Sequence, residues 1–96
     1  MIKEPKTRKE KIQFLKDSAR YVRTTVAIYG EYDSEKGRYM NYYLSRNGKI
    51  SARYQRGGKS KDRMEVEDFA KKFGEEGLNF AIKQIKVKIN IHEISS

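Results

Sequence analysis

The chain contains no cysteine and no tryptophan, and its one histidine is His92. Without cysteine there can be no disulfide framework, no thiolate nucleophile and no cysteine-based zinc site. A single histidine likewise excludes a metal site built from several histidines. We therefore expect neither a metal nor a cofactor, and the absence of cysteine favours a reducing, intracellular environment.

No long apolar run occurs among the 96 residues. A membrane-spanning helix needs about 18 or more consecutive apolar residues, and the first residues, MIKEPKTRKEK, are charged, unlike a secretory signal. We therefore expect a cytoplasmic protein with no membrane partner. With 36% apolar residues, a chain of this length supports one domain, residues 1–96, with one thin core and a basic arm over residues 1–7.

Acidic side chains are in the minority: 13 Asp and Glu stand against 22 Lys and Arg, which gives a formal net charge of +9. The excess is concentrated in residues 36–63, which hold nine basic side chains and the single acid Asp62. A surface that served only solubility would have no reason to gather its charge in one segment. The concentration favours a polyanionic partner, usually nucleic acid, whose counterions are released when its phosphates are neutralised.

The N-terminal half has the pattern of a helix followed by two strands. Thr7 and Glu10 match a capping box, which predicts a helix over residues 8–19. Residues 20–32 and 38–45 alternate between apolar and polar side chains, as strands with one buried face do. If all of the residues between them form the loop, Tyr32 pairs with Arg38 and the apolar faces of the two strands coincide.

Asn47-Gly48 marks the next hairpin turn. A two-residue turn would place the apolar face of the second strand beside polar residues of the third. A three-residue loop, with Gly48 in the left-handed conformation and a G1 bulge, pairs Ser45 with Lys49 and aligns Leu44 with Ile50. Hydrophobic matching therefore predicts the bulged turn.

The C-terminal half has a second capping box, formed by Asp62 and Glu65, which predicts a helix that ends near Gly74. A short helix can follow over residues 78–85, and alternation over residues 85–92 predicts a last strand. The predicted fold class is therefore α+β. It consists of an antiparallel three- to four-stranded sheet, in the order α-β-β-β-α-β, covered on one face by helices.

All seven tyrosines lie between residues 21 and 54. In the predicted register, several of them share the uncovered sheet face with Arg, Lys and Asn. Tyrosine rings can stack on bases, while Arg and Lys can contact phosphates or a guanine edge. The basic loop over residues 56–63 adds glycine N–H groups beside a helix N-terminus. The candidate nucleic-acid-binding residues are Tyr29, Tyr39, Asn41, Tyr43, Lys49, Arg53, Arg56, Lys59, Lys61 and Arg63.

Two resemblances in topology point the same way. Three strands followed by a helix resemble the sheet-reading DNA-binding domains of integrase arm-binding modules. The order α-β-β-β-α, with KSKDR (residues 59–63) leading into the second helix, is similar to double-stranded RNA-binding domains, although their proline-histidine loop has no counterpart here. The single-strand-binding sheets of the PUR type are a looser analogy, and a shared topology alone does not establish function.

Other interpretations stay open beside nucleic-acid binding. Exposed tyrosines also form ordinary cross-strand pairs, and a face rich in Tyr and Arg is typical of protein contacts, such as a homodimer or an inhibitor module that docks an acidic partner. Glu31, Asp33 and Glu35 form the one acidic cluster outside the second helix, and nothing else supports a metal there. We expect a small non-catalytic protein that binds DNA or RNA.

Overall fold

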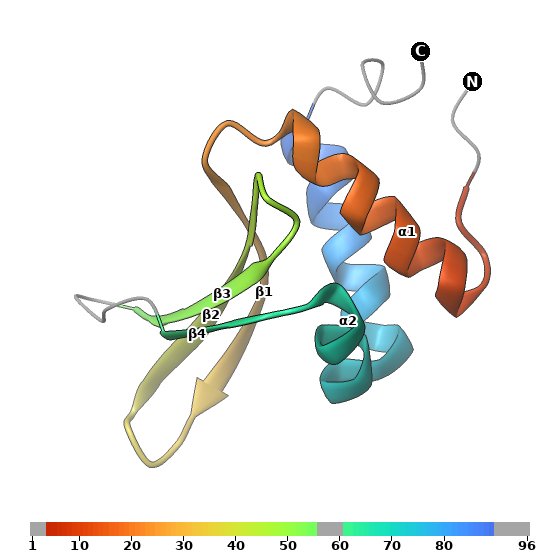
Figure 1. The fold of residues 1–96 in the computed structure, drawn as a ribbon. Coiled ribbons are helices and arrows are strands. Elements are labelled where there is room, and N and C mark those ends of the chain that lie inside the picture. Colours follow the sequence, from red (N-terminus) through yellow and green to blue (C-terminus); the bar gives the residue numbers. More distant parts are fainter. Residues whose placement is uncertain (1–3, 56–60, 90–96) are drawn as a thin grey trace.

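The computed structural model describes residues 4–55 and 61–89, and for residues 61–63 it describes the backbone alone. Along the chain lie helix α1 (Arg8–Ser18), the 3-10 helix η1 (Ala19–Tyr21) and strands β1 (Thr25–Asp33), β2 (Arg38–Ser45), β3 (Ile50–Tyr54) and β4 (Lys61–Met64). Helix α2 (Val66–Lys88) follows (Figure 1). The strands form one antiparallel sheet in the order β1-β2-β3-β4. The predicted α+β class, with an antiparallel sheet and helices on one side, is confirmed.

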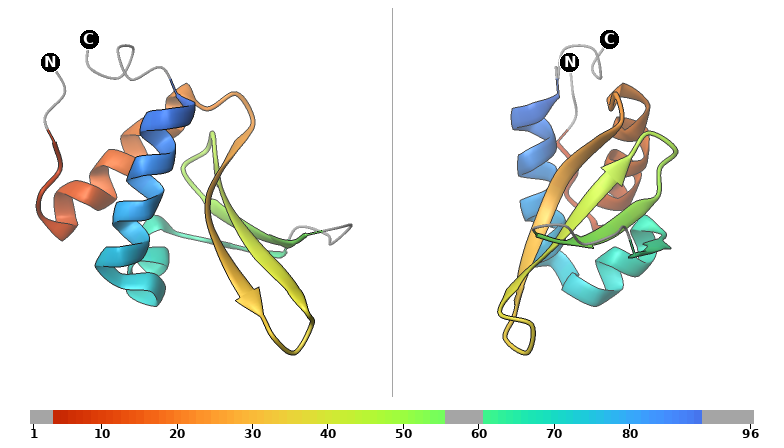
Figure 2. Two further views of the ribbon diagram at one scale, coloured as in Figure 1. Left: turned by 180° about the vertical axis from the view of Figure 1, so that it is seen from behind. Right: turned by 90° about the vertical axis from the view of Figure 1, so that its left-hand side faces the viewer.

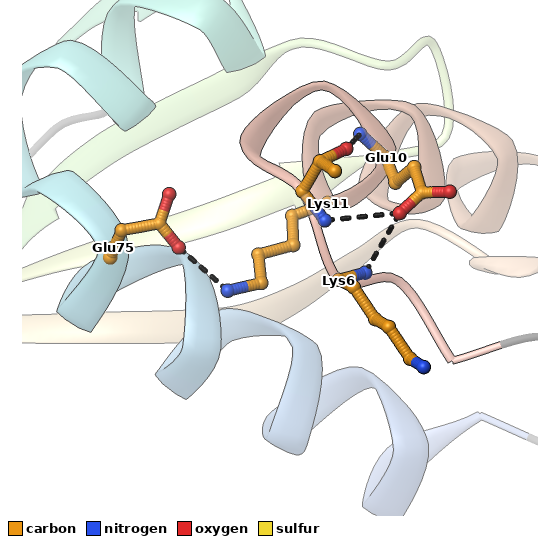
Figure 3. Close-up of polar contacts among 5 residues, drawn as sticks. Lys6, Glu10, Lys11 and Glu75 are labelled. Atoms are coloured by element: carbon orange, nitrogen blue, oxygen red, sulfur yellow. Dashed lines mark hydrogen bonds and ion pairs between the residues drawn. The ribbon is translucent and has the colours of Figure 1, made fainter.

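Helix α1 begins at the predicted capping box. The Thr7 hydroxyl accepts from the Glu10 N–H at 3.1 Å, and the Glu10 carboxylate accepts from the Thr7 N–H at 3.0 Å. Figure 3 shows the same carboxylate accepting from the backbone N–H of Lys6, while Lys11 extends from α1 to Glu75 of α2. The Lys11 Nζ lies 2.6 Å from Glu75 Oε2, so an ion pair between a largely buried lysine and an exposed glutamate joins the two helices.

The β2–β3 hairpin has the predicted register. Tyr42 lies opposite Ala52 and Leu44 opposite Ile50, so the apolar side chains of both strands share one face. Gly48 has a φ of 85°, and the Ser45 N–H donates to the Lys49 carbonyl at 2.9 Å. The bulged three-residue turn is therefore confirmed, and it puts the apolar sides of the two strands in register.

The β1–β2 pairing follows the prediction at one end and departs from it at the other. Val26 lies opposite Leu44 as predicted, but a β-bulge between Ala27 and Tyr29 shifts the rest of β1 by one residue. Tyr32 therefore lies opposite Tyr39, and the predicted Tyr32–Arg38 pairing was wrong. A shift of one residue moves each later side chain of β1 to the other face, because side chains alternate along a strand.

Helix α2 differs from the sequence prediction at both ends. Residues 61–64 pair with β3 as strand β4, so Asp62 does not cap the helix, which begins after Glu65. The expected break at Gly74 is present as a kink with φ 67° and ψ −161°. The predicted last strand was wrong over residues 85–88, which continue α2; the rest of it lies outside the described residues. Leu78, Ala81, Ile82 and Ile85 are buried at helical spacing, and this packing outweighs the alternating pattern.

The core lies between the sheet and the two helices, which occupy the same side of it (Figures 1 and 2). Its centre includes fully buried side chains from every layer: Leu15, Ile28, Leu44, Ile50, Phe69 and Leu78. Within the described ranges, no helix combines the length and the apolar character needed to cross a membrane. One side of the sheet is thus covered by helices, and the other is left without a covering helix among the described residues.

Candidate nucleic-acid interface

The uncovered side of strands β1, β2 and β3, here called the open face, follows from the strand pairing and the burial pattern. None of its side chains belongs to the core, and none carries a carboxylate. Its members are Thr25, Ala27, Gly30, Tyr32, Tyr39, Asn41, Tyr43, Ser45, Ser51 and Arg53. Of the predicted residues, Tyr39, Asn41, Tyr43 and Arg53 lie together on this face.

Tyr29 lies on the helix side of the sheet, and its predicted place on the open face was wrong. The bulge sets Tyr29 opposite Tyr42, a core residue. The Tyr29 ring centroid lies 4.4 Å from that of Phe73 and 5.8 Å from that of Phe69. Tyr29 therefore closes the core as part of an aromatic cluster.

Tyr32 is the open-face tyrosine that the sequence did not identify. Beyond the bulge it lies opposite Tyr39, and the two side chains are 56% and 47% exposed. Their ring centroids are 5.2 Å apart, with the ring planes at 70°. In this edge-to-face arrangement the rings support each other, and much of their surface stays exposed to solvent.

Tyr43 and Arg53 form a second aromatic position farther along the face. The Arg53 guanidinium carbon lies 5.1 Å from the centroid of the Tyr43 ring. Arg53 is exposed and lies opposite Asn41, which is half-buried. A guanidinium held by a ring keeps its N–H donors available to a ligand, because the ring interacts with its face.

Gly30 lies opposite Asn41, between the two aromatic positions. A Cβ at Gly30 would come within 3.3 Å of Asn41 Oδ1 and 4.0 Å of Tyr39 Cδ1. At Gly30 the backbone of β1 therefore has no side chain, and the Asn41 amide and the Tyr39 ring lie close beside it. Among the described residues, no group hydrogen-bonds to the Asn41 side chain.

The other predicted contact residues are ion-paired, lie on the edge strand or lie outside the described residues. The Lys49 ammonium is ion-paired with Glu65, the residue that precedes α2. Lys61 and Arg63 lie on the edge strand β4, for which only the backbone is described. Arg56 and Lys59 lie outside the described residues.

Lysines and arginines play different electrostatic roles. The ion pairs within the described part of the chain are Lys11–Glu75, Lys16–Glu67, Lys49–Glu65 and Lys86–Glu4. Hydrogen bonding from Lys16 is the main reason why the pKa of Glu67 is lowered. No arginine takes part in these pairs, so Arg53 keeps a charge that no described carboxylate neutralises.

Within the acidic cluster near the first hairpin, Asp33 is hydrogen-bonded by the protein itself. Asp33 Oδ2 accepts from the Tyr54 hydroxyl at 2.7 Å, and Asp33 Oδ1 accepts from the backbone N–H of Lys36 at 3.2 Å. These hydrogen bonds, first that from Tyr54, lower the pKa of Asp33. The same hydrogen bond raises the pKa of Tyr54. No group of three or more Asp, Glu, His or Cys side chains in the described part of the chain could hold a metal ion.

Comparison with known proteins adds no family: the chain matches no protein-family model, no curated protein and no solved structure. A functional assignment therefore rests on the geometry of the open face and on the charge of the chain.

Proposed function

We propose that this protein binds nucleic acid through the open face of its sheet. The observation that carries the proposal is the presence of exposed tyrosine rings and the unpaired Arg53 on a face that holds no carboxylate. The binding residues are Tyr32, Tyr39, Asn41, Tyr43 and Arg53. Tyr32 has the stacking role that the sequence had suggested for Tyr29.

Each residue type on the face has a chemical reason to be there. A tyrosine ring stacks on any base, a contribution of roughly 1–3 kcal/mol per base in single-strand binders. Arginine offers a rigid fork of donors to a phosphate or to a guanine edge, and asparagine pairs with adenine. A face without acids does not repel a polyanion, and the net charge of +9 attracts one over a longer range.

The rest of the proposal concerns the basic segment 56–63, whose last three residues belong to β4 and not to the predicted loop, and the absence of catalysis. As expected from the sequence, the cations of this segment would contact phosphates. The proposed role needs no cofactor and no reaction, since stacking and charge neutralisation are binding functions. A nucleic-acid partner also agrees with the cytoplasmic location expected from the sequence.

One observation favours a second candidate function. Tyr32 and Tyr39 are large, exposed and adjacent, and such residues are enriched at protein–protein contacts. The alternative is therefore a module that forms a homodimer, or docks an acidic protein, through the same face. Salt separates the two functions, because phosphate binding weakens linearly in log[salt], whereas a tyrosine-rich homodimer responds little.

The test is a fluorescence-anisotropy titration of labelled oligonucleotides with the wild type, Arg53→Ala and Arg8→Ala. Arg8 is the matched control, because it is an exposed arginine of α1 without an ion pair to any described residue. Arg53→Ala should weaken binding and reduce the salt slope by about 0.7–0.9, while Arg8→Ala should leave both nearly unchanged. Equal behaviour of the two variants would refute the open face as the binding site. Salt-independent dimerisation without oligonucleotide binding would support the alternative.

A further inference from the structure

Two aromatic positions lie on the open face at a defined separation. The first is the Tyr32–Tyr39 pair and the second is Tyr43 with Arg53. Tyr39 and Tyr43 are four residues apart on β2, which corresponds to about 13 Å at the usual rise of a strand. That distance is about four times the 3.4 Å spacing of stacked bases, so the two positions can hold different bases of one strand.

The surface between the two positions is suited to a flat group. Gly30 lies there without a side chain, and beside it lies the Asn41 amide, to which no described residue hydrogen-bonds. Asparagine can pair through two hydrogen bonds with the N6 and N7 atoms of adenine. A base that lay over Gly30 would thus meet a polar edge while its neighbours stacked on the tyrosines.

We propose that the open face selects unpaired nucleotides over a double helix, and that it holds a run of up to about five of them at stacked spacing. This inference rests on the proposed function and adds the class of nucleic acid to it. The tyrosines at the two positions are the stacking residues, and a further base lies over Gly30 between them. Arg53 binds an adjacent phosphate.

Base geometry is the reason for this selectivity. A duplex hides the faces of its bases inside the stack and presents their edges and its phosphates. Exposed tyrosine rings gain nothing from base edges, but each gains a stacking contact from an unpaired base. Arg53 adds a guanidinium plane beside Tyr43, and unpaired bases stack on such planes as well.

The experiment compares a short single-stranded oligonucleotide with a hairpin duplex that contains the same sequence, each as DNA and as RNA. Because the protein has no tryptophan, its fluorescence comes from tyrosine, and quenching that is lost when Tyr39 or Tyr43 is replaced reports stacking on those rings. Tyr39→Leu and Tyr43→Leu should weaken single-strand binding roughly 5- to 150-fold each and leave duplex binding nearly unchanged. Tyr43→Phe should retain binding, since it keeps the ring.

A substitution at Gly30 supplies a second, independent readout. Gly30→Val would place a branched side chain against the Asn41 amide while keeping a strand-forming residue. It should reduce single-strand binding, whereas Gln13→Leu, at an exposed position of α1, should not. Circular dichroism of both variants checks that they are folded.

The outcomes distinguish a failure of the selectivity from a failure of the proposed nucleic-acid binding. Equal affinity for single strand and duplex, or equal losses for both in the leucine variants, would overturn the selectivity and leave nucleic-acid binding intact. Failure to bind any of the four oligonucleotides would overturn both. The DNA and RNA arms show which sugar the unpaired strand carries.

Discussion

The bulge in β1 decides which tyrosine stabilises the fold, and a pair of substitutions tests it. In the structure, Tyr29 packs among the phenylalanines of α2 and Tyr43 lies on the open face. In the register without a bulge, both would lie on the open face. Tyr29→Ala and Tyr43→Ala should therefore differ in their effects on stability.

The size of the difference follows from the contacts. Replacing a fully buried aromatic residue by alanine costs about 3–5 kcal/mol. Tyr29 is only half-buried, but it contacts Phe69, Phe73 and Phe80. We expect its loss to cost about 2–3 kcal/mol. Tyr43→Ala removes a cation–π contact and lowers the strand propensity, and we expect it to cost about 1 kcal/mol.

Urea unfolding followed by circular dichroism measures both free energies of unfolding, and thermal unfolding gives an independent comparison. For a domain of this size, 1 kcal/mol corresponds to about 4–8 °C in Tm, so the two variants should differ by about 5–15 °C. An equal or larger loss in Tyr43→Ala would show that β1 has no bulge and that Tyr29 is not part of the core.

Three further predictions concern the remainder of the fold. Gly74→Ala should destabilise the protein by about 1–3 kcal/mol in urea unfolding, because the residue at the kink has φ 67° and ψ −161°. The cost is one of backbone conformation, since a Cβ there would meet no atom within 4 Å. A neutral result would mean that the helix is not kinked. Leu44→Ala should cost about 2–5 kcal/mol, since Leu44 is fully buried, and a loss below 1 kcal/mol in the same assay would contradict its place in the core. The lowered pKa of Asp33 means that its contact with Tyr54 stabilises the fold fully above the ordinary carboxyl pKa, and that this contribution is lost as pH falls through the folded-state pKa. A carbon-13 NMR titration should therefore show that Tyr54→Phe raises the pKa of Asp33 toward its ordinary value, and an unchanged pKa would count against the hydrogen bond.

The second hairpin could be predicted because its register has only one solution that keeps apolar side chains together. The three-residue turn at Gly48 aligns Leu44 with Ile50, whereas the two-residue turn does not. Hydrophobic matching and turn geometry predicted the same register for this hairpin. The placement of Tyr43 and Arg53 on the open face followed from that register.

The first hairpin was predicted correctly only up to the bulge. Ile28 and Tyr29 are both compatible with a buried position, and a simple alternating pattern assigns them to opposite faces. The structure places both toward the helices, because phenylalanines of α2 lie beside Tyr29. Contacts so distant in sequence leave no local signal, so Tyr32 could not be identified in advance.

The C-terminal helix shows how tertiary packing overrides a local pattern. Residues 85–88 alternate as a strand would, but Val87 is 73% exposed and Ile85 is fully buried in α2. The helical spacing of Leu78, Ala81, Ile82 and Ile85 was also visible in the sequence. Only the shared core with α1 and the sheet decides between the two patterns.

The central claim, that the open face binds nucleic acid, is tested most directly by NMR. Nitrogen-15-labelled protein is titrated with a single-stranded oligonucleotide, and the amide signals are followed residue by residue. The account predicts the largest shifts at Tyr32, Tyr39, Asn41, Tyr43 and Arg53, with small shifts along α1. Shifts confined to the helices, or no shifts in the presence of excess oligonucleotide, would contradict it.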